Sequence, residues 1–246
     1  MDDDARTLLI AVAATAVIAL VLGWLLRSWL TARSVHRLQR FFGLPENSEC
    51  VLVVSRETGS DGALARNDVF ALLELSAVIK NCGAKAHLIS GETTQLGFGE
   101  RTEFCIGGPV SNRRLAAHLA SLLPGVAVNT DAEPGPDRGA FLIGSERYRL
   151  ENGSVEYVLL ARLTAGQQGR PVFLACGQRA VTNQAAARYL AKHHSRLARK
   201  YGSGGNFCLL LKVVNSQAYG PDVVELVKDV TRAATAPRPK VATGKD

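Results

Sequence analysis

The sequence begins with an uncharged apolar run from Thr7 to Leu26 that limits what the whole chain can be. At ~1.5 Å per residue, a helix of this length reaches about 30 Å, the thickness of the hydrocarbon core of a bilayer. A cleaved signal peptide is the alternative. However, the residues before the run are acidic rather than basic, and the run is longer than the apolar region of an ordinary signal peptide. We therefore predict a transmembrane helix over residues 7–26.

Charges on either side of this run predict its orientation. Three Asp and one Arg precede it, whereas four arginines and no acid follow it before Glu46: Arg27, Arg33, Arg37 and Arg40. Lys and Arg favour the cytoplasmic side, so we expect residues 1–6 outside the cell membrane and everything after the helix inside. Residues 27–44 form a basic juxtamembrane segment, which either contacts anionic lipid or serves only as a topology signal.

The remaining chain has the composition of one globular domain. We assign residues 45–235 to a cytoplasmic domain and residues 236–246 to a disordered tail. The formal net charge is +7, and removing residues 1–30, with three Asp and two Arg, leaves +8. This basic excess fits anionic lipid or a phosphorylated metabolite. No helix-turn-helix stands out, so we expect no nucleic acid. The five cysteines lie in apolar runs without a CxxC motif, which indicates reduced thiols and neither a disulfide framework nor a zinc site.

Apolar strands alternate with helices along the domain. The runs 50–55, 171–177 and 206–214 are almost wholly apolar, as in strands covered on both faces. Helical spacing covers residues 68–81 and 182–200. The pattern predicts an α/β fold with an open, mostly parallel, Rossmann-like sheet and helices on both faces. We also predict a hairpin insertion that turns at Glu151-Asn152-Gly153, and a last helix over residues 221–232.

A strand–turn–helix pattern occurs twice. Residues 104–119 resemble residues 173–190: each copy has an apolar strand, a glycine, a short loop, Ser/Thr-Asn, and a helix containing an Ala-Ala pair. Ser111 and Thr182 are predicted N-cap residues, followed at matching positions by Asn112 and Asn183. Each copy ends a strand and begins a helix at the carboxyl edge of the sheet, where open α/β sheets bind ligands.

The two copies together define a predicted anion site. Their glycines let a ligand approach the backbone, and arginines beside them offer guanidinium forks for phosphate. The predicted ligand-binding residues are Gly107, Gly108, Ser111, Asn112, Arg113, Gly177, Arg179, Thr182 and Asn183. Arg114 could add a further fork, and Ser55-Arg56, after the first strand, a third wall. The alternative is ordinary architecture, in which the same residues only cap helices and form turns.

The sequence contains no familiar cofactor or catalytic motif. Neither GxGxxG nor GxxxxGK[ST] occurs at these turns, and GxSxG and HExxH are absent, so no cofactor and no metal are expected. Whether the protein is an enzyme stays open. In a nucleotide-processing hydrolase or glycosidase, Glu103 or Glu74 would serve as the acid or nucleophile, and Arg113 would hold the phosphate. His118 has no visible partner.

Several segments carry a resemblance to known proteins. ECVLVVS, DVFALLELSAVIKNCGA, TEFCIGGPVSN and FLACG with TNQAAARYL resemble a group of uncharacterised actinobacterial single-pass membrane proteins. The order of strands and glycine turns more loosely resembles Rossmann-like nucleotide-sensing domains. This second resemblance implies a nucleotide or nucleotide-sugar ligand at the glycines, Ser111, Thr182 and the two asparagines of the repeat.

Three functional hypotheses follow. The first is a membrane-anchored cytoplasmic domain that binds a phosphorylated small molecule, expected to be a nucleotide, as a sensor or regulator. The second is an enzyme acting on the same ligand. The third is an interaction scaffold beside the membrane that binds no small molecule. The sequence does not identify the ligand or the protein partners.

Overall fold

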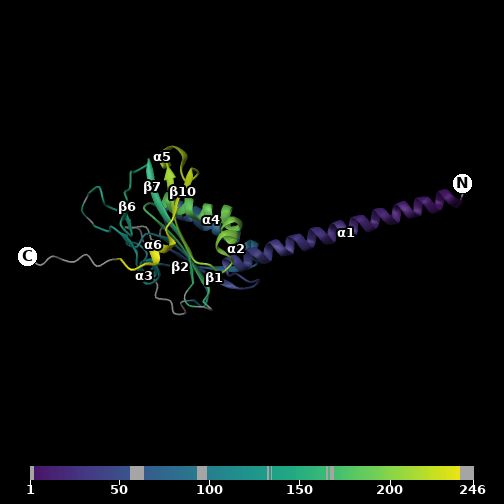
Figure 1. Ribbon diagram of the computed structural model, residues 1–246, viewed down its shortest axis with the longest axis horizontal. Coiled ribbons are helices and arrows are strands. Elements are labelled where there is room, and N and C mark those ends of the chain that lie inside the picture. The colour runs from purple at the N-terminus through teal and green to yellow at the C-terminus, as the bar shows by residue number, and fades with distance from the viewer. Residues whose placement is uncertain are drawn as a thin grey trace, which may run out of the picture.

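The computed structural model describes residues 3–55, 64–92, 99–131, 133, 135–164, 166 and 169–238. Two features dominate it: one long helix, α1, and an α/β domain into which the end of that helix is built (Figure 1). Of the predicted disordered tail, only residues 236–238 lie within the described part of the chain. Arg56 lies outside it.

A seven-stranded sheet forms the centre of the domain, in the order β10-β9-β7-β8-β3-β1-β2. Its strands are β1 (Glu49–Val54), β2 (Lys85–Ser90), β3 (Thr102–Gly107), β7 (Val155–Thr164), β8 (Pro171–Gly177), β9 (Phe207–Val214) and β10 (Val224–Asp229). The strands β2, β1, β3 and β8 are parallel to one another. The strands β7, β9 and β10 then alternate in direction. The sheet is therefore mixed, and parallel at one end only.

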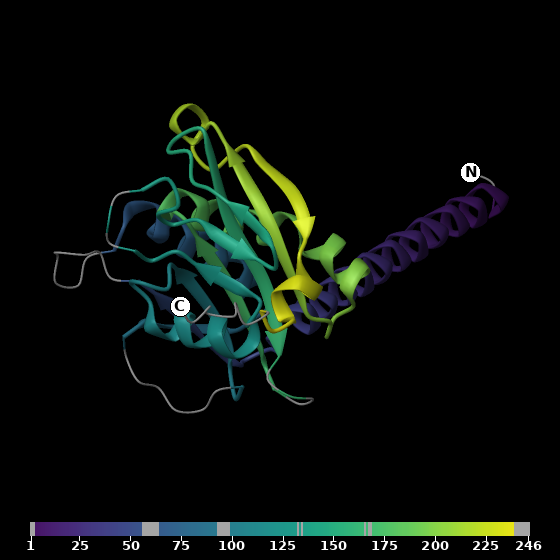
Figure 2. The same cartoon turned by 60° about the vertical axis from the view of Figure 1, so that its left-hand side comes forward.

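Two layers cover this sheet. On one face, α2 (Arg66–Asn81) and α4 (Ala180–Tyr201) pack against each other and share an apolar core with the end of α1. On the other face lie α3 (Arg113–Leu122), α6 (Thr231–Thr235) and a small antiparallel sheet. That small sheet contains β4 (Val126–Val128), β5 (Phe141–Ile143) and β6 (Glu146–Tyr148). The remaining short helix is α5 (Ser216–Tyr219). Figure 2 shows the layers from a second side.

The predicted α/β class with an N-terminal apolar helix is confirmed, but two local predictions are wrong. Residues 224–229, expected to be helical, form the edge strand β10, because antiparallel pairing with β9 satisfies a strand edge that would otherwise stay open. The turn at 151–153 does not join two strands of one hairpin. β7 instead pairs along its length with β8 and β9, and only an isolated bridge joins Glu151 to Val155.

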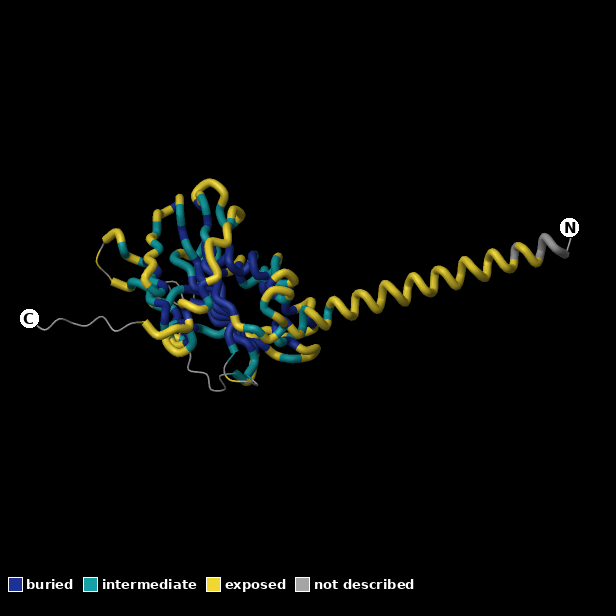
Figure 3. Tube along the Cα trace, in the orientation of Figure 1, coloured by how far each residue is buried: buried dark blue, intermediate teal, exposed yellow. Residues whose placement is uncertain are grey.

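Helix α1 runs without interruption from Asp3 to Phe42. Its segment from Ile10 to Phe42 is long and apolar enough to cross a membrane, and the apolar stretch within it is unburied. Figure 3 shows exposed residues along the helix until it meets the domain. The last turn differs: Phe41, Phe42 and Leu44 are fully buried. The rings of Phe41 and Phe42 pack against those of the sheet, and the centroid of Phe42 lies 5.3 Å from that of Phe173 with the rings tilted.

Three side chains, from β3, from β7 and from the residue before β8, donate hydrogen bonds to the carboxyl end of α1. Thr102 donates to the carbonyls of Phe42 and Gly43 at 3.1 and 2.9 Å, and Arg170 donates to Gly43. Arg162, buried within β7, donates to the carbonyl of Phe41 at 3.0 Å. A helix leaves its last carbonyls without intrahelical partners, and cations are stabilising beside them. The long helix is therefore held firmly at the amino edge of the parallel strands.

Candidate functional site

The two strand–turn–helix units end side by side. β3 and β8 are hydrogen-bonded neighbours, with Gly107 in register with Cys176, so both turns open at the same carboxyl edge. They border a cleft of about 490 Å³, within the usual range for small-molecule sites. The lining comes from the ends of β1, β3, β8 and β4 and from the first turns of α2 and α4: Ser55, Ala65, Asp68, Gly107, Gly108, Pro109, Val110, Ser111, Val128, Asn129, Thr130, Asp131, Arg138, Gly139, Gly177, Gln178, Arg179, Ala180 and Asn183.

Close packing requires a glycine at two positions in these turns, Gly107 and Gly177. Gly107 has a φ of +132°, and a Cβ there would lie 1.9 Å from the Ser55 hydroxyl oxygen. A Cβ on Gly177 would lie 2.2 Å from the Thr182 hydroxyl oxygen. Gly108 is different, because a Cβ there would meet only the carbonyl of Gly177, at 3.8 Å. The two turns therefore approach each other across an open space beside Gly108.

In the first unit the capping residue is Asn112, not Ser111. The Asn112 side chain accepts from the Leu115 amide at 2.9 Å and donates to the carbonyl of Ile106 at 3.1 Å. It is fully buried and does not line the cleft. Ser111 lies one residue before the cap, half-buried at the wall of the cleft. The predicted cap role therefore belongs to the neighbouring residue, whose side chain can reach both backbone groups.

In the second unit the helix begins earlier than predicted, at Ala180. Thr182 is consequently the third helical residue rather than the N-cap. Its hydroxyl donates to the carbonyl of Arg179 at 2.7 Å, and its side chain is buried outside the cleft lining. The helix starts early because Gln178 is fixed directly after β8. The Gln178 side-chain amide nitrogen donates to two carbonyls, and its oxygen accepts from a β7 amide at 2.8 Å.

Asn183 gives the cleft its most distinctive polar atom. The side chain is only 3% exposed, and its amide nitrogen donates to Asp68 Oδ1 at 2.9 Å. The other amide atom, Oδ1, is buried and has no hydrogen-bond partner among the described residues. A buried polar atom without a partner costs free energy, so native structures rarely leave one unexplained. This oxygen lies against Gly177, in the turn that borders the cleft, 2.4 Å from the position that a Cβ would take there.

The predicted arginines do not gather around the cleft. Arg113 is exposed and is not among the lining residues. Arg114 binds Glu103 through two guanidinium nitrogens. Arg179 lines the cleft, but its Nη1 atom contacts Asn152 and lies 2.9 Å from the buried carboxylate of Glu156.

Charged side chains in the cleft are balanced in sign. Asp68 and Asp131 line it together with Arg138 and Arg179. The positive polarisation expected from the sequence therefore does not come from an excess of lining arginines. The backbone at the start of α4 is the remaining source, because the helix dipole is positive at that end and the amides of Ala180 and Val181 precede the first amide that donates within the turn, that of Thr182 to the carbonyl of Arg179.

Glu103 lies in a buried charge cluster instead of in the cleft. It occupies the second position of β3, where its carboxylate accepts from Arg114 Nε at 2.7 Å and contacts His118 Nε2 at 3.1 Å. Burial alone raises the pKa of this carboxyl, but the hydrogen bonds from Arg114 and His118 outweigh burial and lower the pKa to about 2. His118 thus has the partner that the sequence did not reveal.

The same cluster brings Glu103, Cys105 and His118 within 4.8 Å of one another, a spacing that a metal ion could use. Arg114, however, already places its guanidinium on both oxygens of Glu103. Burial also raises the pKa of the Cys105 thiol far above its usual range. An internal ion pair therefore explains this cluster without an added cation.

The second catalytic candidate also lies elsewhere. Glu74, on α2, accepts a hydrogen bond from Arg188 at 2.8 Å and does not line the cleft. Of the acids in the described part of the chain, Asp68 and Asp131 are the two that do. The sequence predicts Asp68 near the crevice and as a helix N-cap, and residues 129–139 as a loop. Asp68 does line the cleft, but the N-cap is Ala65 and Asp68 is the third residue of α2. No motif marks them, because only the small sheet β4-β5-β6 brings that loop to the cleft.

Comparison with known proteins adds no family. The chain matches no family model, no curated protein and no solved structure.

Proposed function

We propose that this protein is a membrane-anchored α/β domain that binds a phosphorylated small molecule, such as a nucleotide, in the cleft at the carboxyl edge of the sheet. The observation that supports this most directly is the convergence of both glycine turns on one cleft. The parallel half of the sheet gives this edge the geometry at which Rossmann-like domains hold phosphates.

The polar groups of the cleft favour a ligand with two chemical ends. The backbone amide of Ala180, at the start of α4, suits a phosphate, which the helix dipole also stabilises. The unpartnered Oδ1 of Asn183 and the buried carboxylate of Asp68 are acceptors, so they suit hydroxyl or amino groups. A nucleotide or a sugar phosphate carries both kinds of group. A simple inorganic anion carries only the first.

We further propose that α1 anchors the domain at the cytoplasmic face of the membrane. The apolar segment of α1 is unburied. Four arginines follow this segment, and the positive-inside rule places the end of a membrane helix that carries such arginines in the cytoplasm. Because the carboxyl end of α1 is fixed at the amino edge of the sheet, the cleft lies at the opposite edge. With strands of six residues at ~3.3 Å each, the two edges are about 20 Å apart, and the cleft faces away from the bilayer.

Thermal stability of the full chain in neutral detergent tests the ligand. Nucleoside mono-, di- and triphosphates, sugar phosphates and inorganic phosphate are compared at equal concentration. A ligand at one hundred times its Kd stabilises the folded state by about 2.7 kcal/mol, so a binder raises the midpoint by several degrees. Gly108→Val, which fills the open space beside Gly177, is expected to abolish the rise, and Ser121→Ala on the outer side of α3 is the matched control.

We propose binding rather than a reaction because Glu103 and Glu74 are each tied to an arginine outside the cleft. If no phosphorylated compound stabilises the full chain, or if Gly108→Val responds like the unaltered protein, this assignment of the cleft is wrong. If chromatography detects conversion of a stabilising nucleotide to a product, the result would instead support the hypothesis of a nucleotide-processing hydrolase.

A further inference from the structure

A second hollow lies where the long helix meets the domain. It is a groove of about 500 Å³ between α1 and α4, far from the cleft at the carboxyl edge. Its lining combines Arg37, Arg40 and Arg199 with the apolar Leu38, Phe41 and Ala198, and adds a histidine and three serines. We call this hollow the α1–α4 groove. It contains three arginines and no acid.

The absence of acids extends well beyond the lining. Neither α4 nor the part of α1 after Thr7 contains an Asp or Glu. These two segments together carry nine Lys and Arg: Arg27, Arg33, Arg37, Arg40, Arg188, Lys192, Arg196, Arg199 and Lys200. Without these nine, the 20 remaining cations and 22 acids of the chain would give a net charge of −2. The basic excess of the protein therefore belongs to these two helices.

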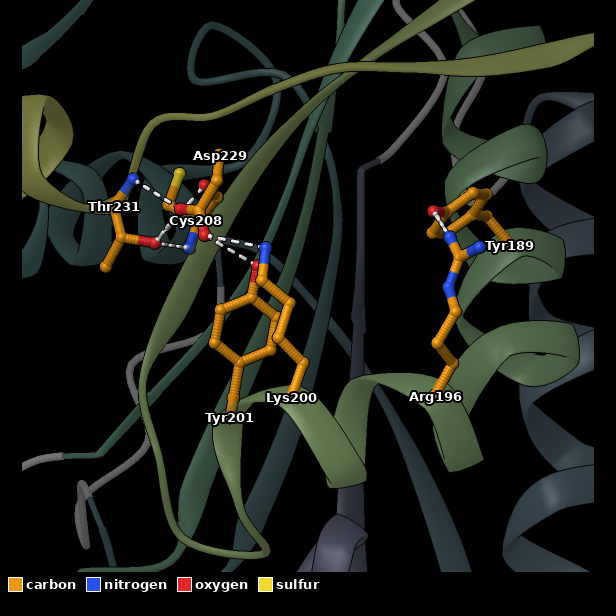
Figure 4. A network of polar contacts seen from close by, with 7 residues as sticks. All are labelled: Tyr189, Arg196, Lys200, Tyr201, Cys208, Asp229 and Thr231. Carbon is orange, nitrogen blue, oxygen red and sulfur yellow. Dashed lines mark hydrogen bonds and ion pairs between the residues drawn. The ribbon is translucent and has the colours of Figure 1, made fainter.

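Three cations of α4 that lie outside the groove already have partners. On α4 itself, Arg188 binds Glu74 and Asp222, Lys200 lies 3.3 Å from Asp229, and Arg196 donates to the Tyr189 hydroxyl at 2.7 Å. Figure 4 shows Lys200 reaching Asp229 and Arg196 reaching Tyr189, in two separate contacts. No described acid forms an ion pair with any of the three arginines that line the groove.

The position of the groove indicates what neutralises it. α1 continues as one helix from the apolar segment to the groove, and Arg37 follows Leu26 by 11 residues, or about 16 Å along the axis. Side chains on a helix lean toward its amino end, which here is the membrane side, so Arg37 and Arg40 reach back toward the bilayer. Leu38, Phe41 and Ala198 supply an apolar floor beside the cations.

The groove is also held in a fixed shape. Arg162 donates to the carbonyl of Phe41 in α1 and to those of Ser203 and Gly205 in the loop after α4. Burial lowers the pKa of Arg162 to about 10, so it remains charged at neutral pH. This one side chain therefore ties the backbones of both walls of the groove together.

We propose that the α1–α4 groove binds the headgroup phosphate of an anionic phospholipid, with Arg37, Arg40 and Arg199 as its ligands. This inference rests on the proposed membrane anchor and is independent of the ligand at the carboxyl edge. The groove sets the domain at a defined angle to the bilayer, because the headgroup joins α4 to the plane in which α1 is inserted. α4 then reaches from this groove at Arg199 to the cleft at Ala180, and so spans the domain between the two sites.

The test uses the full chain in neutral detergent. Dioctanoyl phosphatidylglycerol, dioctanoyl phosphatidylcholine and inorganic phosphate are titrated while the thermal midpoint is followed. We expect phosphatidylglycerol to raise the midpoint in a saturable way and the other two to leave it unchanged. Each arginine near an anionic lipid contributes about fivefold in affinity, so Arg40→Gln with Arg199→Gln should weaken binding about 25-fold.

Two further variants separate a site from general charge attraction. Arg40→Lys with Arg199→Lys keeps the charge and should retain most of the binding. Arg147→Gln with Arg232→Gln removes two exposed cations far from α1 and should leave the affinity for phosphatidylglycerol unchanged. An equal effect of the control pair, or an unchanged affinity after Arg40→Gln with Arg199→Gln, would overturn the proposal. So would an equal rise with inorganic phosphate, which would make the groove a site for a free anion.

Failure of this proposal can be told from failure of the anchor. Retention of the full chain in vesicles of pure phosphatidylcholine after an alkaline wash tests the membrane span alone. A chain that stays in those vesicles but shows no preference for phosphatidylglycerol keeps the anchor and loses the lipid site. A chain that is washed out loses both. Nucleotide-dependent stability is measured separately and depends on neither result.

Discussion

The two strand–turn–helix units are similar in sequence but have different structural roles in the folded protein. In the β3–α3 unit, Asn112 is turned inward as a helix cap, and the strand carries a buried ion cluster around Glu103. In the β8–α4 unit, the residue in register with Glu103 is Val172, and Asn183 leaves a buried, unpartnered oxygen beside the glycine turn that borders the cleft. The same Ser/Thr-Asn pair therefore serves stability in one unit and offers a ligand contact in the other.

This difference follows from where each helix begins. α3 starts after its asparagine, whereas α4 starts three residues before its asparagine. A side chain at an N-cap meets the amides of its own helix, but a side chain one turn further on meets neighbouring elements. For Asn183 that neighbour is Asp68 of α2. We therefore expect changes in the first unit to affect folding and changes in the second unit to affect binding.

The largest effect is expected for Glu103→Gln. Removing one partner of a buried ion pair leaves Arg114 and His118 uncompensated, which should lower the free energy of unfolding by about 3 kcal/mol. Chemical denaturation of the full chain in detergent measures this. Glu49→Gln is the matched control: that carboxylate also lies at the start of a parallel strand, but it is 45% exposed beside Arg101, and its loss should cost less than about 1 kcal/mol.

The pH dependence of the same variant sharpens this prediction. The pKa of Glu103 in the folded protein, about 2, is below its ordinary value of 4.5. The ionised cluster therefore stabilises the fold fully above about pH 4.5, and its contribution is lost as the pH falls toward about 2. The difference in unfolding free energy between the unaltered protein and Glu103→Gln should shrink over that range. A constant difference would show that Glu103 contributes by packing alone.

A smaller loss of stability is expected for Gly107→Ala. The φ of +132° is strained for a residue with a side chain, and the new Cβ would displace the Ser55 hydroxyl, together costing about 2 kcal/mol. Gly108→Ala is the comparison within the same turn, because its Cβ meets nothing closer than 3.8 Å. It should change the thermal midpoint by less than about 2 °C. Equal destabilisation by both would contradict the described turn.

Asn112→Ala should cost about 1 kcal/mol, the usual value for loss of an N-cap side chain. Because the side chain is buried away from the cleft, the affinity for a stabilising nucleotide, measured by calorimetry, should stay within about twofold. A loss of affinity larger than the loss of stability would mean that the first asparagine also reaches the ligand, and the contrast between the units would fail.

The smallest stability effect is expected for Asn183→Ala. Its buried Oδ1 is already without a partner, so removing it relieves a cost that offsets the lost bond to Asp68, and the net change should be below about 1 kcal/mol. Nucleotide affinity should instead fall about tenfold, as for the loss of one buried ligand hydrogen bond. The reverse pattern, an unstable variant with normal affinity, would assign Asn183 to the fold and not to the cleft.

The sequence by itself determined the features that depend on local composition. The unbroken apolar run predicted a helix able to span a membrane, and continuous apolar strands between helices predicted the α/β class. Glycines after the two strands also predicted turns at one edge, because neighbouring parallel strands end together. Each of these follows from periodicity and residue type within a short window.

Only the tertiary structure decided which polar side chains face the cleft. Arg114 was predicted as a possible phosphate contact, but the carboxylate of Glu103 takes it up. Gln178 holds the first turn of α4 through backbone groups up to 39 residues away, and Asp68 reaches Asn183 across 115 residues. Likewise, Phe41 at the end of the long helix belongs to the domain core. These pairings depend on which charges and hydrogen-bond donors the folded chain brings within about 3 Å, and no local pattern encodes that distance.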